Sequence, residues 1–349
     1  MKNLLIQADN LMALNFLLEE RKLKGKIDLI YIDPPFATGS NFSISENRAS
    51  TISKAKYGKI AYTDTLKGSD FLEFLKYRLL YLKELLSPQG SIYLHIDYKI
   101  GHYVKILMDE VFGIENFKND ITRIKCNPKN FNRIGYGNIK DMILFYSKSA
   151  EPIWNEPRQK YSSIDIEKLF SKINKYGRRY TTVPIHAPGE TVSGSTSKLF
   201  RGIAPPKGRH WRADVETLEK WDKEGLIEWS SKGTPRKIIF ADERQGKRVQ
   251  DIWEFKDPQI PAYPTEKSDK LLDLIIKTSS NVDSIVLDCF CGSGTTLKAA
   301  QLNNRKWIGI DQSDLAINAT INKIQKIENS LSADPSEFDF INLKDTTIY

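Results

Sequence analysis

The stretch SIVLDCFCGSGTT, residues 284–296, joins a short apolar run to a turn that contains two glycines. The run 284–288 is typical of a buried strand, and the threonines after the glycines begin a helix predicted to reach about Leu302. A second apolar run, KWIGI at 306–310, ends at Asp311. Strand, Gly-x-Gly turn, helix, strand and terminal acid together form the half-unit of a nucleotide-binding α/β fold.

The glycine turn restricts the ligand that this half-unit can bind. Gly292 and Gly294 let the backbone approach a ligand closely, and the carboxylate of Asp311 can accept hydrogen bonds from both hydroxyls of a ribose. The third glycine of the dinucleotide fingerprint is missing, and so is the Gly-Lys-Ser/Thr ending of a Walker loop. The turn therefore predicts a nucleoside that need not carry a pyrophosphate, a description that S-adenosylmethionine fits.

A second predicted strand, residues 27–32, ends in the tetrapeptide Asp33-Pro34-Pro35-Phe36. Prolines lack the N–H group that a strand ladder needs, so the strand stops at this corner. The corner offers a carboxylate, free backbone carbonyls and an aromatic ring at the carboxyl end of a strand, where open α/β sheets bind their ligands. A proline-terminated strand end without function is the alternative interpretation of the tetrapeptide alone.

The remaining pattern predicts an α/β fold with a doubly wound, mostly parallel sheet. In the first 150 residues we expect strands at 4–7, 27–32, 91–96, 121–125 and 142–146, and helices at about 10–23, 69–86 and 100–111. A further helix is predicted at about 268–278, ahead of the glycine turn. Residues 37–65 are polar and rich in lysine and arginine, so we expect an irregular segment there, either a surface loop or a lid that touches phosphates.

Residues 151–260 differ in character from the rest of the chain. Between 151 and 250 there are 20 lysines and arginines against 13 aspartates and glutamates, which places +7 of the chain's net charge of +8 in this segment. Five of the six tryptophans lie between 151 and 260. Interleaved basic and aromatic residues predict a nucleic-acid interface formed by Arg209, Trp211, Arg212, Arg236 and Lys237. A small α+β insertion with tryptophans in its core is the structural alternative, and the two interpretations are compatible.

The overall composition narrows the class of protein. With 40% hydrophobic and 28% charged residues, the chain has the composition of a globular protein. It has no apolar run as long as a membrane span, and its first residues lack the apolar core of a signal peptide, so we expect a cytoplasmic protein without membrane contact. Three cysteines do not form a disulfide framework, and the four histidines show no ligand spacing, so we expect no metal site.

The corner and the glycine turn together resemble the DNA amino-methyltransferases of bacterial restriction–modification systems. The signatures of that family are an (Asp/Asn/Ser)-Pro-Pro-(Tyr/Phe/Trp) corner and a Phe-x-Gly-x-Gly loop, which stand here at 33–36 and 290–294. The corner precedes the basic segment and the loop follows it, which is the circularly permuted order of the β group. The stretch 31–41 is most similar to modification subunits of type III systems, whereas a length of 349 residues fits a stand-alone type II enzyme equally.

The resemblance implies a Rossmann-like methyltransferase fold in three segments. These are a catalytic half at 1–150, an inserted α+β target-recognition segment at 151–260 and a cofactor-binding half at 261–349. The catalytic corner would be Asp33, Pro34, Pro35 and Phe36. The cofactor would be S-adenosyl-L-methionine, and the residues implied in its binding are Asp9, Asn10, Asp33, Thr265, Lys267, Asp288, Phe290, Cys291, Gly292, Gly294, Thr295 and Asp311. Within this set Asp311 holds the ribose, Asp9 and Asn10 face the adenine, and Asp288 either binds the methionyl amine or only caps the turn.

The implied reaction is methylation of adenine N6 in double-stranded DNA. The target base would be flipped out of the duplex and stacked on Phe36, and its amino nitrogen would attack the methyl group in line, without a covalent enzyme intermediate. Asp33 as the first residue of the corner favours adenine N6, and cytosine N4, where Ser is usual, is the alternative. An RNA or protein-glutamine substrate and an inactive DNA-binding specificity module also stay open, although intact Asp33 and glycines argue against the last. The partners implied are double-stranded DNA, a cognate restriction endonuclease and, as is common in the group, a second copy of the chain.

Overall fold

The computed structural model describes residues 1–35, 41–45, 48–51, 59–63, 68–128, 134–258, 266–331 and 338–343. The chain divides into two compact units. The first consists of Met1–Pro157 and Gln250–Tyr349, and the second is Arg158–Val249. Each unit contains its own cluster of buried apolar side chains, so each is described by itself.

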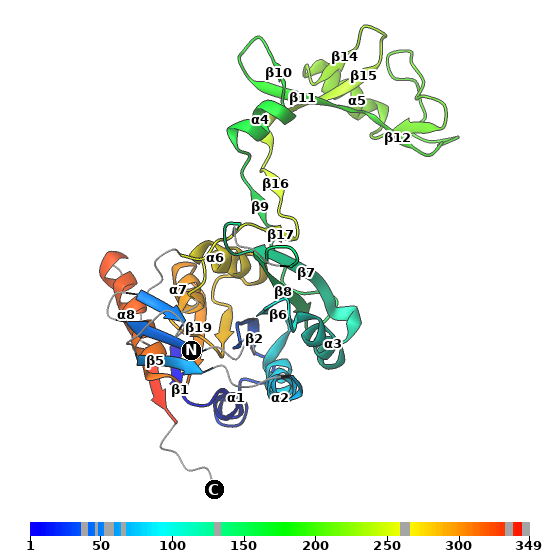
Figure 1. Cartoon of the computed structure of the whole chain (residues 1–349). Coiled ribbons are helices and arrows are strands. Elements are labelled where there is room, and N and C mark those ends of the chain that lie inside the picture. The colour runs from blue at the N-terminus through cyan, green and yellow to red at the C-terminus, as the bar shows by residue number, and fades with distance from the viewer. Residues whose placement is uncertain are drawn as a thin grey trace. The chain divides into compact units, whose positions relative to one another are not determined.

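A nine-stranded sheet forms the centre of the first unit, in the order β17-β7-β8-β6-β2-β18-β19-β1-β20 (Figure 1). Strand β8 is antiparallel to both its neighbours, and the other neighbours pair in parallel. The strands are β1 (Asn3–Gln7), β2 (Ile27–Ile32), β6 (Leu86–Ile96), β7 (Phe117–Ile124), β8 (Lys140–Ser147), β17 (Ile252–Trp253), β18 (Ile285–Asp288), β19 (Lys306–Asp311) and β20 (Phe338–Asn342). Because parallel strands run the same way, the carboxyl ends of β6, β2, β18, β19 and β1 meet at one edge of the sheet.

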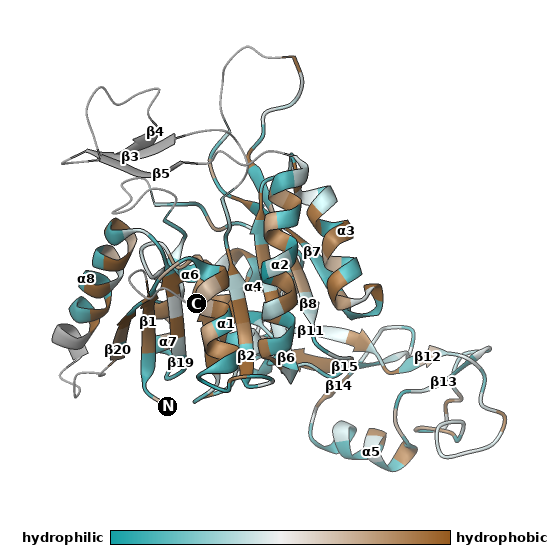
Figure 2. Ribbon diagram, turned by 90° about the horizontal axis from the view of Figure 1, so that it is seen from below, coloured by the Kyte–Doolittle hydropathy of each residue, from teal (hydrophilic) through white to brown (hydrophobic). Residues whose placement is uncertain are grey.

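Helices cover both faces of this sheet. The helices are α1 (Asn10–Glu19), α2 (Ser69–Leu85), α3 (Gly101–Phe112), α6 (Asp269–Ser279), α7 (Thr295–Leu302) and α8 (Asp314–Leu331), with a short 3-10 turn at Ile114–Asn116. Figure 1 shows α1 and α2 on one side of the strands and α6 and α7 on the other. The largely apolar strands β1, β2 and β19 appear in brown in Figure 2.

Residue alternation along the strands explains the two covered faces. Ile30 of β2 and Leu287 of β18 belong to the core formed with α1, α2 and α3. Their neighbours Leu29 and Val286 are also fully buried, and successive side chains of a strand point to opposite faces. The sheet is therefore buried on both sides, and the predicted doubly wound, mostly parallel fold is confirmed.

Strand β1, the first of the chain, lies between β19 and β20, which are the last two strands described. In the same way β2 and β18, which are far apart in the sequence, are neighbours, with Leu29 opposite Val286 and Ile30 opposite Leu287. This strand order is the circularly permuted arrangement that the sequence predicts. It places the end of the corner strand beside the end of the glycine-turn strand.

The expected irregular segment at 37–65 contains strands, so that prediction was wrong for part of it. The antiparallel strands β3 (Asn41–Ser45), β4 (Arg48–Thr51) and β5 (Lys59–Thr63) pair with one another. Polar and apolar residues alternate in 41–45, which is a strand signal. The basic and polar composition of the whole segment obscured that alternation.

The second unit is a small α+β assembly. Its strands form a sheet in the order β10-β11-β15-β14 and two further pairs, β12–β13 and β9–β16. The strands are β9 (Arg158–Gln159), β10 (Lys172–Ile173), β11 (Arg179–Pro184), β12 (His186–Pro188), β13 (Arg209–Trp211), β14 (Ile227–Trp229), β15 (Pro235–Phe240) and β16 (Lys247–Arg248), with helices α4 (Ser163–Leu169) and α5 (Val215–Lys223) and a 3-10 turn at Ala241–Glu243. Its core contains Ile185, Phe200, Trp211, Leu218 and Ile227.

The second unit is narrower than the predicted segment 151–260. Trp154 stacks on Phe145 of β8, with ring centroids 5.9 Å apart, so it belongs to the first unit. At the other boundary, Ile252 and Trp253 form β17 and extend the main sheet beside β7. A strand of two residues is too short for sequence periodicity to reveal, and the change in composition therefore set both boundaries too wide. No helix in the described part of the chain is long and apolar enough to cross a membrane.

Candidate active site

The carboxyl edge of the main sheet gathers residues that are distant in the sequence. Asp33 follows β2, Asp288 ends β18, Asp311 ends β19 and Asp9 follows β1. The β2–β18 pair lies near the centre of the sheet, where a doubly wound fold binds its ligands beyond the strand ends. Phe36 and Thr265, two of the predicted site residues, lie outside the described residues.

Asp33 is held at this edge by a buried ion pair. Its Oδ2 lies 2.6 Å from the Nζ of Lys267, and the two side chains are only 14% and 9% exposed. The other oxygen, Oδ1, is buried and has no hydrogen-bond partner in the described structure. A buried acceptor without a donor lowers the stability of the fold, because its lost hydrogen bonds to water are not replaced. This oxygen is therefore suited to a ligand that supplies an N–H group. The structure thus brings together two predicted site residues, Asp33 and Lys267.

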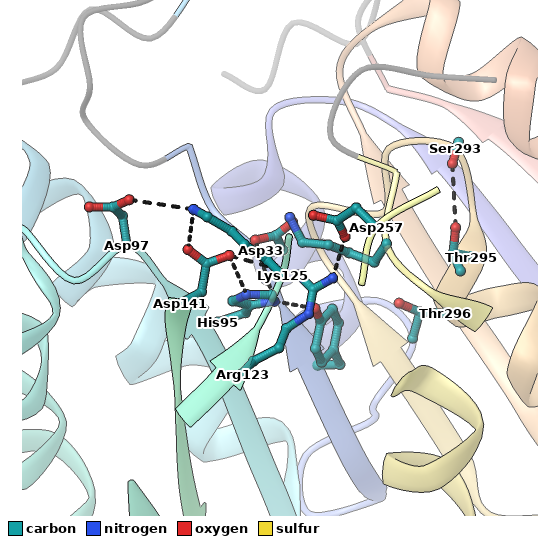
Figure 3. A network of polar contacts seen from close by, with 12 residues as sticks. Asp33, His95, Asp97, Arg123, Lys125, Asp141, Asp257, Ser293, Thr295 and Thr296 are labelled. Carbon is teal, nitrogen blue, oxygen red and sulfur yellow. Dashed lines mark hydrogen bonds and ion pairs between the residues drawn. The ribbon is translucent and has the colours of Figure 1, made fainter. Parts of the chain in front are cut away.

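A polar network continues from Asp33 into the sheet (Figure 3). The Nδ1 atom of His95, on β6, lies 4.0 Å from Asp33 Oδ1 and 2.9 Å from the hydroxyl of Tyr31. The Nε2 atom of His95 lies 3.2 Å from Asp141 Oδ2, on β8. Burial lowers the pKa of His95, which is fully enclosed. Burial would raise the pKa of Asp141, but the hydrogen bonds from His95 and Lys125 outweigh it and hold that pKa well below its usual range.

Two further cations complete the network. Lys125 Nζ lies 2.5 Å from Asp141 Oδ1 and 3.9 Å from Asp97 Oδ2. Arg123, fully buried, lies 3.7 Å from Asp141 and pairs with Asp257. The residues of this network other than Asp33 were not predicted from the sequence. A signal was present for His95 and Asp97, because these two polar residues lie at the end of the largely apolar run 92–97.

The glycine loop, residues 289–295, is fixed to the acid that ends β19. The N–H of Gly292 donates to Asp311 Oδ2 over 3.0 Å, and Asp311 Oδ1 accepts from the N–H of Ser313. Gly292 and Gly294 have φ angles of 51° and 75°. A Cβ atom on Gly294 would lie 2.7 Å from Thr320 Oγ1, so that position admits no larger residue without a shift of α8. The loop and Asp311, which the sequence analysis assigns to one nucleoside site, are therefore in direct contact.

Lys323 of α8 binds the glycine loop from the side. Its Nζ lies 2.9 Å from Ser293 Oγ, 3.0 Å from Thr295 Oγ1 and 2.5 Å from Glu266 Oε1. Glu266 precedes Lys267, so two consecutive residues connect the loop, through Lys323, to the corner, through Asp33. Lys323 was not predicted from the sequence, because it lies in an ordinary amphipathic helix with no motif around it.

Asp288 is a buried strand-end cap in this structure. Its Oδ1 accepts from the N–H of Phe290 over 3.0 Å, and its Oδ2 accepts from the hydroxyl of Thr296 over 2.6 Å. Burial raises the pKa of Asp288 to about 7. These contacts agree with the alternative interpretation that Asp288 caps the turn, because each of its oxygens accepts a hydrogen bond from the loop or from α7.

The two cysteines of the loop pack inside the fold. Cys289 and Cys291 are buried, and burial raises the pKa of both thiols. A thiol that stays protonated is a poor nucleophile, so these residues act as small apolar side chains. Cys291, a predicted cofactor-binding residue, uses its backbone N–H for the carbonyl of Ile310.

The end of β1 is joined to the glycine loop through α2. Asp9 caps α1 by accepting from the N–H of Leu11, and its other oxygen lies 3.1 Å from Arg78 Nη2. Asn10 is buried and donates to the carbonyl of Cys289 over 3.1 Å, while Arg78 Nε donates to Asn10 over 2.5 Å. Asp9 stays half exposed beside this contact. The buried Arg78, which the sequence analysis missed, thus holds both predicted residues against the loop.

The predicted nucleic-acid residues of the second unit separate into two groups. Trp211 is 1% exposed, lies in the core, and donates its indole N–H to the carbonyl of Lys198. The prediction that Trp211 contacts nucleic acid is therefore wrong, because the small unit needs this large side chain for its own core. The ammonium of Lys237 lies 3.3 Å from the centre of the Trp221 ring, which leaves it less available to a ligand.

Three arginines gather around His186. Arg209 and Arg212 are exposed, and their guanidinium groups bond the ring and the carbonyl of His186. Arg236 bonds Thr182 on the neighbouring strand β11. Burial and the positive charges of Arg209, Arg212 and Arg236 lower the pKa of His186. These four residues are called the arginine patch below.

A protein-family model described as DNA methylase matches residues 27–322. This chain belongs to the DNA methylase family. It is 41% identical to the type II methyltransferase M.EcaI of Enterobacter cloacae, over 89% of this chain and 67% of that protein. It is 26% identical to the StyLTI Mod subunit of a type III restriction–modification enzyme of Salmonella typhimurium, over 87% of this chain and 50% of that protein. The chain thus spans two thirds of the first relative and half of the second, and the predicted restriction–modification family is confirmed.

Solved structures of lower similarity cover nearly the whole chain. The M1.HpyAVI–SAM complex is 16% identical, with a TM-score of 0.49, over 92% of this chain and 98% of that one. The cytosine-N4-specific PvuII DNA methyltransferase is 14% identical, with a TM-score of 0.48, over 99% of this chain and 96% of that one.

The buried carboxyl of Asp288 predicts a pH-dependent stability. The unfolded chain loses this proton near the ordinary value of 3.8, and the native protein loses it near 7, so between these values stability falls as the pH rises. We expect the Asp288→Asn variant to melt at a higher temperature than the wild type at pH 8, with a gain of at most about 4 kcal/mol that shrinks at pH 5. Melting curves at both pH values, with the exposed Asp120→Asn as control, measure this. A difference independent of pH would contradict it.

Proposed function

We propose that this chain transfers a methyl group from S-adenosyl-L-methionine to the exocyclic N6 of adenine at a specific sequence in double-stranded DNA. The observation that carries the proposal is the position of Asp33. Its buried Oδ1, which has no hydrogen-bond partner among the described residues, lies at the end of β2, directly beside the strand that leads into the glycine loop. An acceptor for an amino group thus adjoins a loop suited to a nucleoside, in a member of the DNA methylase family.

Asp33 would stabilise the transition state more than the ground state. The amino group of a flipped base would donate to Asp33 Oδ1 and to the carbonyl of Pro34, and Phe36 would stack on the base. The nitrogen gains positive charge as the new bond forms, so its attraction to a carboxylate strengthens along the reaction. Lys267 holds the other oxygen of Asp33 and so fixes the direction in which Oδ1 points.

The glycine loop and the strand ends beside it would hold S-adenosyl-L-methionine, which supplies an activated methyl group. Asp311 is proposed to bind the ribose, and Asp9 and Asn10 to lie near the adenine. Phe290, Gly292, Gly294 and Thr295 would line the methionyl side, with Thr265 and Lys267 close to it. The positive φ of both glycines and the anchoring of the loop to Asp311 support this fit, because they keep side chains out of the approach to the backbone. Asp288 would support the loop through its cap.

Adenine is preferred over cytosine because of the first residue of the corner. Both reactions methylate an amino group on an aromatic ring, so the geometry of Asp33 serves either base. The resemblance associates Asp with adenine N6 and Ser with cytosine N4. Cytosine N4 therefore stays the alternative base, with the same site and mechanism.

The second unit is proposed to recognise the target sequence. It carries 20 lysines and arginines against 11 aspartates and glutamates between residues 158 and 249, a net charge of +9. The arginine patch supplies exposed guanidinium groups, which bind phosphates and guanine edges. Arg209 and Arg212 are the residues proposed to contact DNA, with Arg236 beside them. The relatives of both types support a restriction–modification role with a cognate endonuclease, and a homodimer stays a prediction.

The first experiment is base-modification sequencing of DNA from a methylation-free host that expresses the chain. We expect N6-methyladenine at one short motif, and no mark from the Asp33→Ala variant, which loses the acceptor. That variant should still bind S-adenosyl-L-methionine within a few fold of the wild type, because the loop is unchanged. N4-methylcytosine would overturn the choice of base, and no mark from the wild type would overturn the proposed activity.

The contacts of Lys323 with the glycine loop should strengthen cofactor binding. The Lys323→Met variant loses the hydrogen bonds to Ser293 and Thr295, so the loop is held less firmly. Because hydrogen bonds to a charged group contribute about 1.5–3 kcal/mol, we expect the dissociation constant for S-adenosyl-L-methionine to rise roughly 10- to 100-fold in calorimetry. Lys326→Met, an exposed position on the same helix, is the control. Equal affinities for the two variants would place the cofactor away from this loop.

The arginine patch predicts the salt dependence of DNA binding. Each phosphate contact contributes about −0.9 to the slope of log K against log salt, so Arg209→Gln and Arg212→Gln should each flatten the slope by about one. Arg178→Gln is the matched control, since it removes one charge from the same unit but Arg178 is paired with Asp242 and Glu243. Titrations at several salt concentrations measure the slopes. An unchanged slope in the first two variants would remove the patch from the interface.

A further inference from the structure

His95 is a buried base that the proposed methyl transfer does not yet use. It lies on β6, fully enclosed, with Tyr31 of β2 and Asp33 on one side and Asp141 of β8 on the other. The charges of Lys267, beside Asp33, and of Arg123, beside Asp141, also act on it. Tyr31, Asp33, Asp141, Lys267 and Arg123 are thus titratable or charged groups of the described structure that act on its ring.

The hydrogen-bond partners of the His95 ring determine which of its two nitrogens can accept a proton. Asp141 is held in its ionised form and can only accept, so His95 Nε2, 3.2 Å away, carries the proton and donates it. Burial raises the pKa of Tyr31, so its hydroxyl keeps its proton and donates to Nδ1 over 2.9 Å. Nδ1 therefore has a lone pair in the resting state. It lies 4.0 Å from Asp33 Oδ1, an oxygen without another hydrogen-bond partner in the described structure.

Methylation of an amino group creates a proton that has to leave. As the N–CH3 bond forms, the S–CH3 bond breaks and its electron pair stays on the sulfur, so the positive charge moves from sulfur to nitrogen. The nitrogen then carries one hydrogen more than the neutral product. Asp33 touches this nitrogen in the proposed complex and is the first acceptor. Its other neighbour, Lys267, is a cation and cannot take the proton onward.

We propose that His95 receives this proton from Asp33, as a positioning and proton-relay residue whose imidazolium form is stabilised by Asp141. The inference rests on the proposed function. The proton passes from the methylated nitrogen to Asp33 Oδ1 and from there to the lone pair of His95 Nδ1, while the Tyr31 hydroxyl turns its hydrogen away from this nitrogen. This transfer restores the Asp33 carboxylate. A closure of about 1 Å between Oδ1 and Nδ1 brings these atoms into hydrogen-bond range. An Asp–His–Asp arrangement is suited to this transfer, because the negative charge of Asp141 stabilises the positive charge that the His95 ring acquires.

The surroundings of His95 also favour its return to the neutral form. Arg123 and Lys267 repel a proton on the ring, and burial disfavours the charged imidazolium. The proton therefore does not stay on His95 between turnovers. Once the methylated product has left the site, the proton returns to Asp33 Oδ1 and passes to the water that replaces the product. Lys125 holds the carboxylate of Asp141 in place and also lies 3.9 Å from Asp97.

The test is the pH dependence of methyl transfer in single turnovers, at saturating DNA and S-adenosyl-L-methionine. In the wild type the rate should fall in acid, below the pH at which an ordinary histidine titrates, because a protonated His95 cannot accept and burial lowers its pKa. His95→Gln should lower the rate about 100-fold at pH 7.5, the scale of general acid–base catalysis, and should lose this acid limb. Cofactor affinity and melting temperature, measured in parallel, report on the fold.

Two further variants make the test independent of the folding of His95→Gln. Asp141→Asn removes the charge that stabilises the imidazolium, so the acid limb should move to lower pH. Tyr31→Phe removes the donor that stabilises neutral Nδ1, so the limb should move to higher pH. Shifts in these opposite directions are not expected if His95 only supports the structure.

The outcomes separate this inference from the proposed function. A wild type that transfers no methyl group to DNA would overturn the proposed function itself. An active wild type with His95→Gln within threefold of its rate would overturn the relay alone. A slower His95→Gln that keeps the acid limb, or limbs that do not move in Asp141→Asn and Tyr31→Phe, would reduce His95 to a structural role and equally overturn the relay.

Discussion

The parallel pairing of β2 with β18 is the constraint on which the rest of the site depends. The sequence at the end of either strand alone does not specify a functional site. Pairing Leu29 with Val286 and Ile30 with Leu287 fixes the relative height of the two ends, so Asp33 and the glycine loop lie side by side. Both strands are apolar on both faces, and any slip in their register would move a buried side chain to the wrong face of the sheet. The hydrophobic core therefore sets the geometry of the polar edge.

Three acids at that edge of the sheet each form an ion pair with a lysine or an arginine. Asp33 faces Lys267, Asp141 faces Lys125, and Asp257 faces Arg123. Loss of one partner of a buried pair typically costs about 3–5 kcal/mol, because the remaining charge keeps its desolvation penalty. Each pair therefore compensates part of the cost of burying its acid. His95 is the neutral member of this network, and its position between two acids gives it a use that a purely structural pair would not have.

Residues 266–267 connect the two halves of the site. Lys267 holds the corner, and Glu266 reaches the glycine loop through Lys323 of α8. The corner and the loop are thus tied by side chains as well as by the sheet. The contacts of these two residues fix the corner relative to the loop, which fits a reaction in which the base and the methyl donor have to meet in line.

The sequence by itself determined the fold class, the permuted order and the two ends of the site, because these are recorded in local patterns. Apolar runs of strand length, two glycines at a turn and two prolines at a corner restrict the backbone wherever they occur. Tertiary structure alone decided the rest. Whether Trp211 is core or surface depends on what packs against it, and the boundary at β17 depends on a sheet edge supplied by β7. The contacts of His95 with Tyr31 and Asp141, and of Lys323 with the loop, join residues from separate elements. Their energies arise from distances and burial that no local stretch of sequence contains.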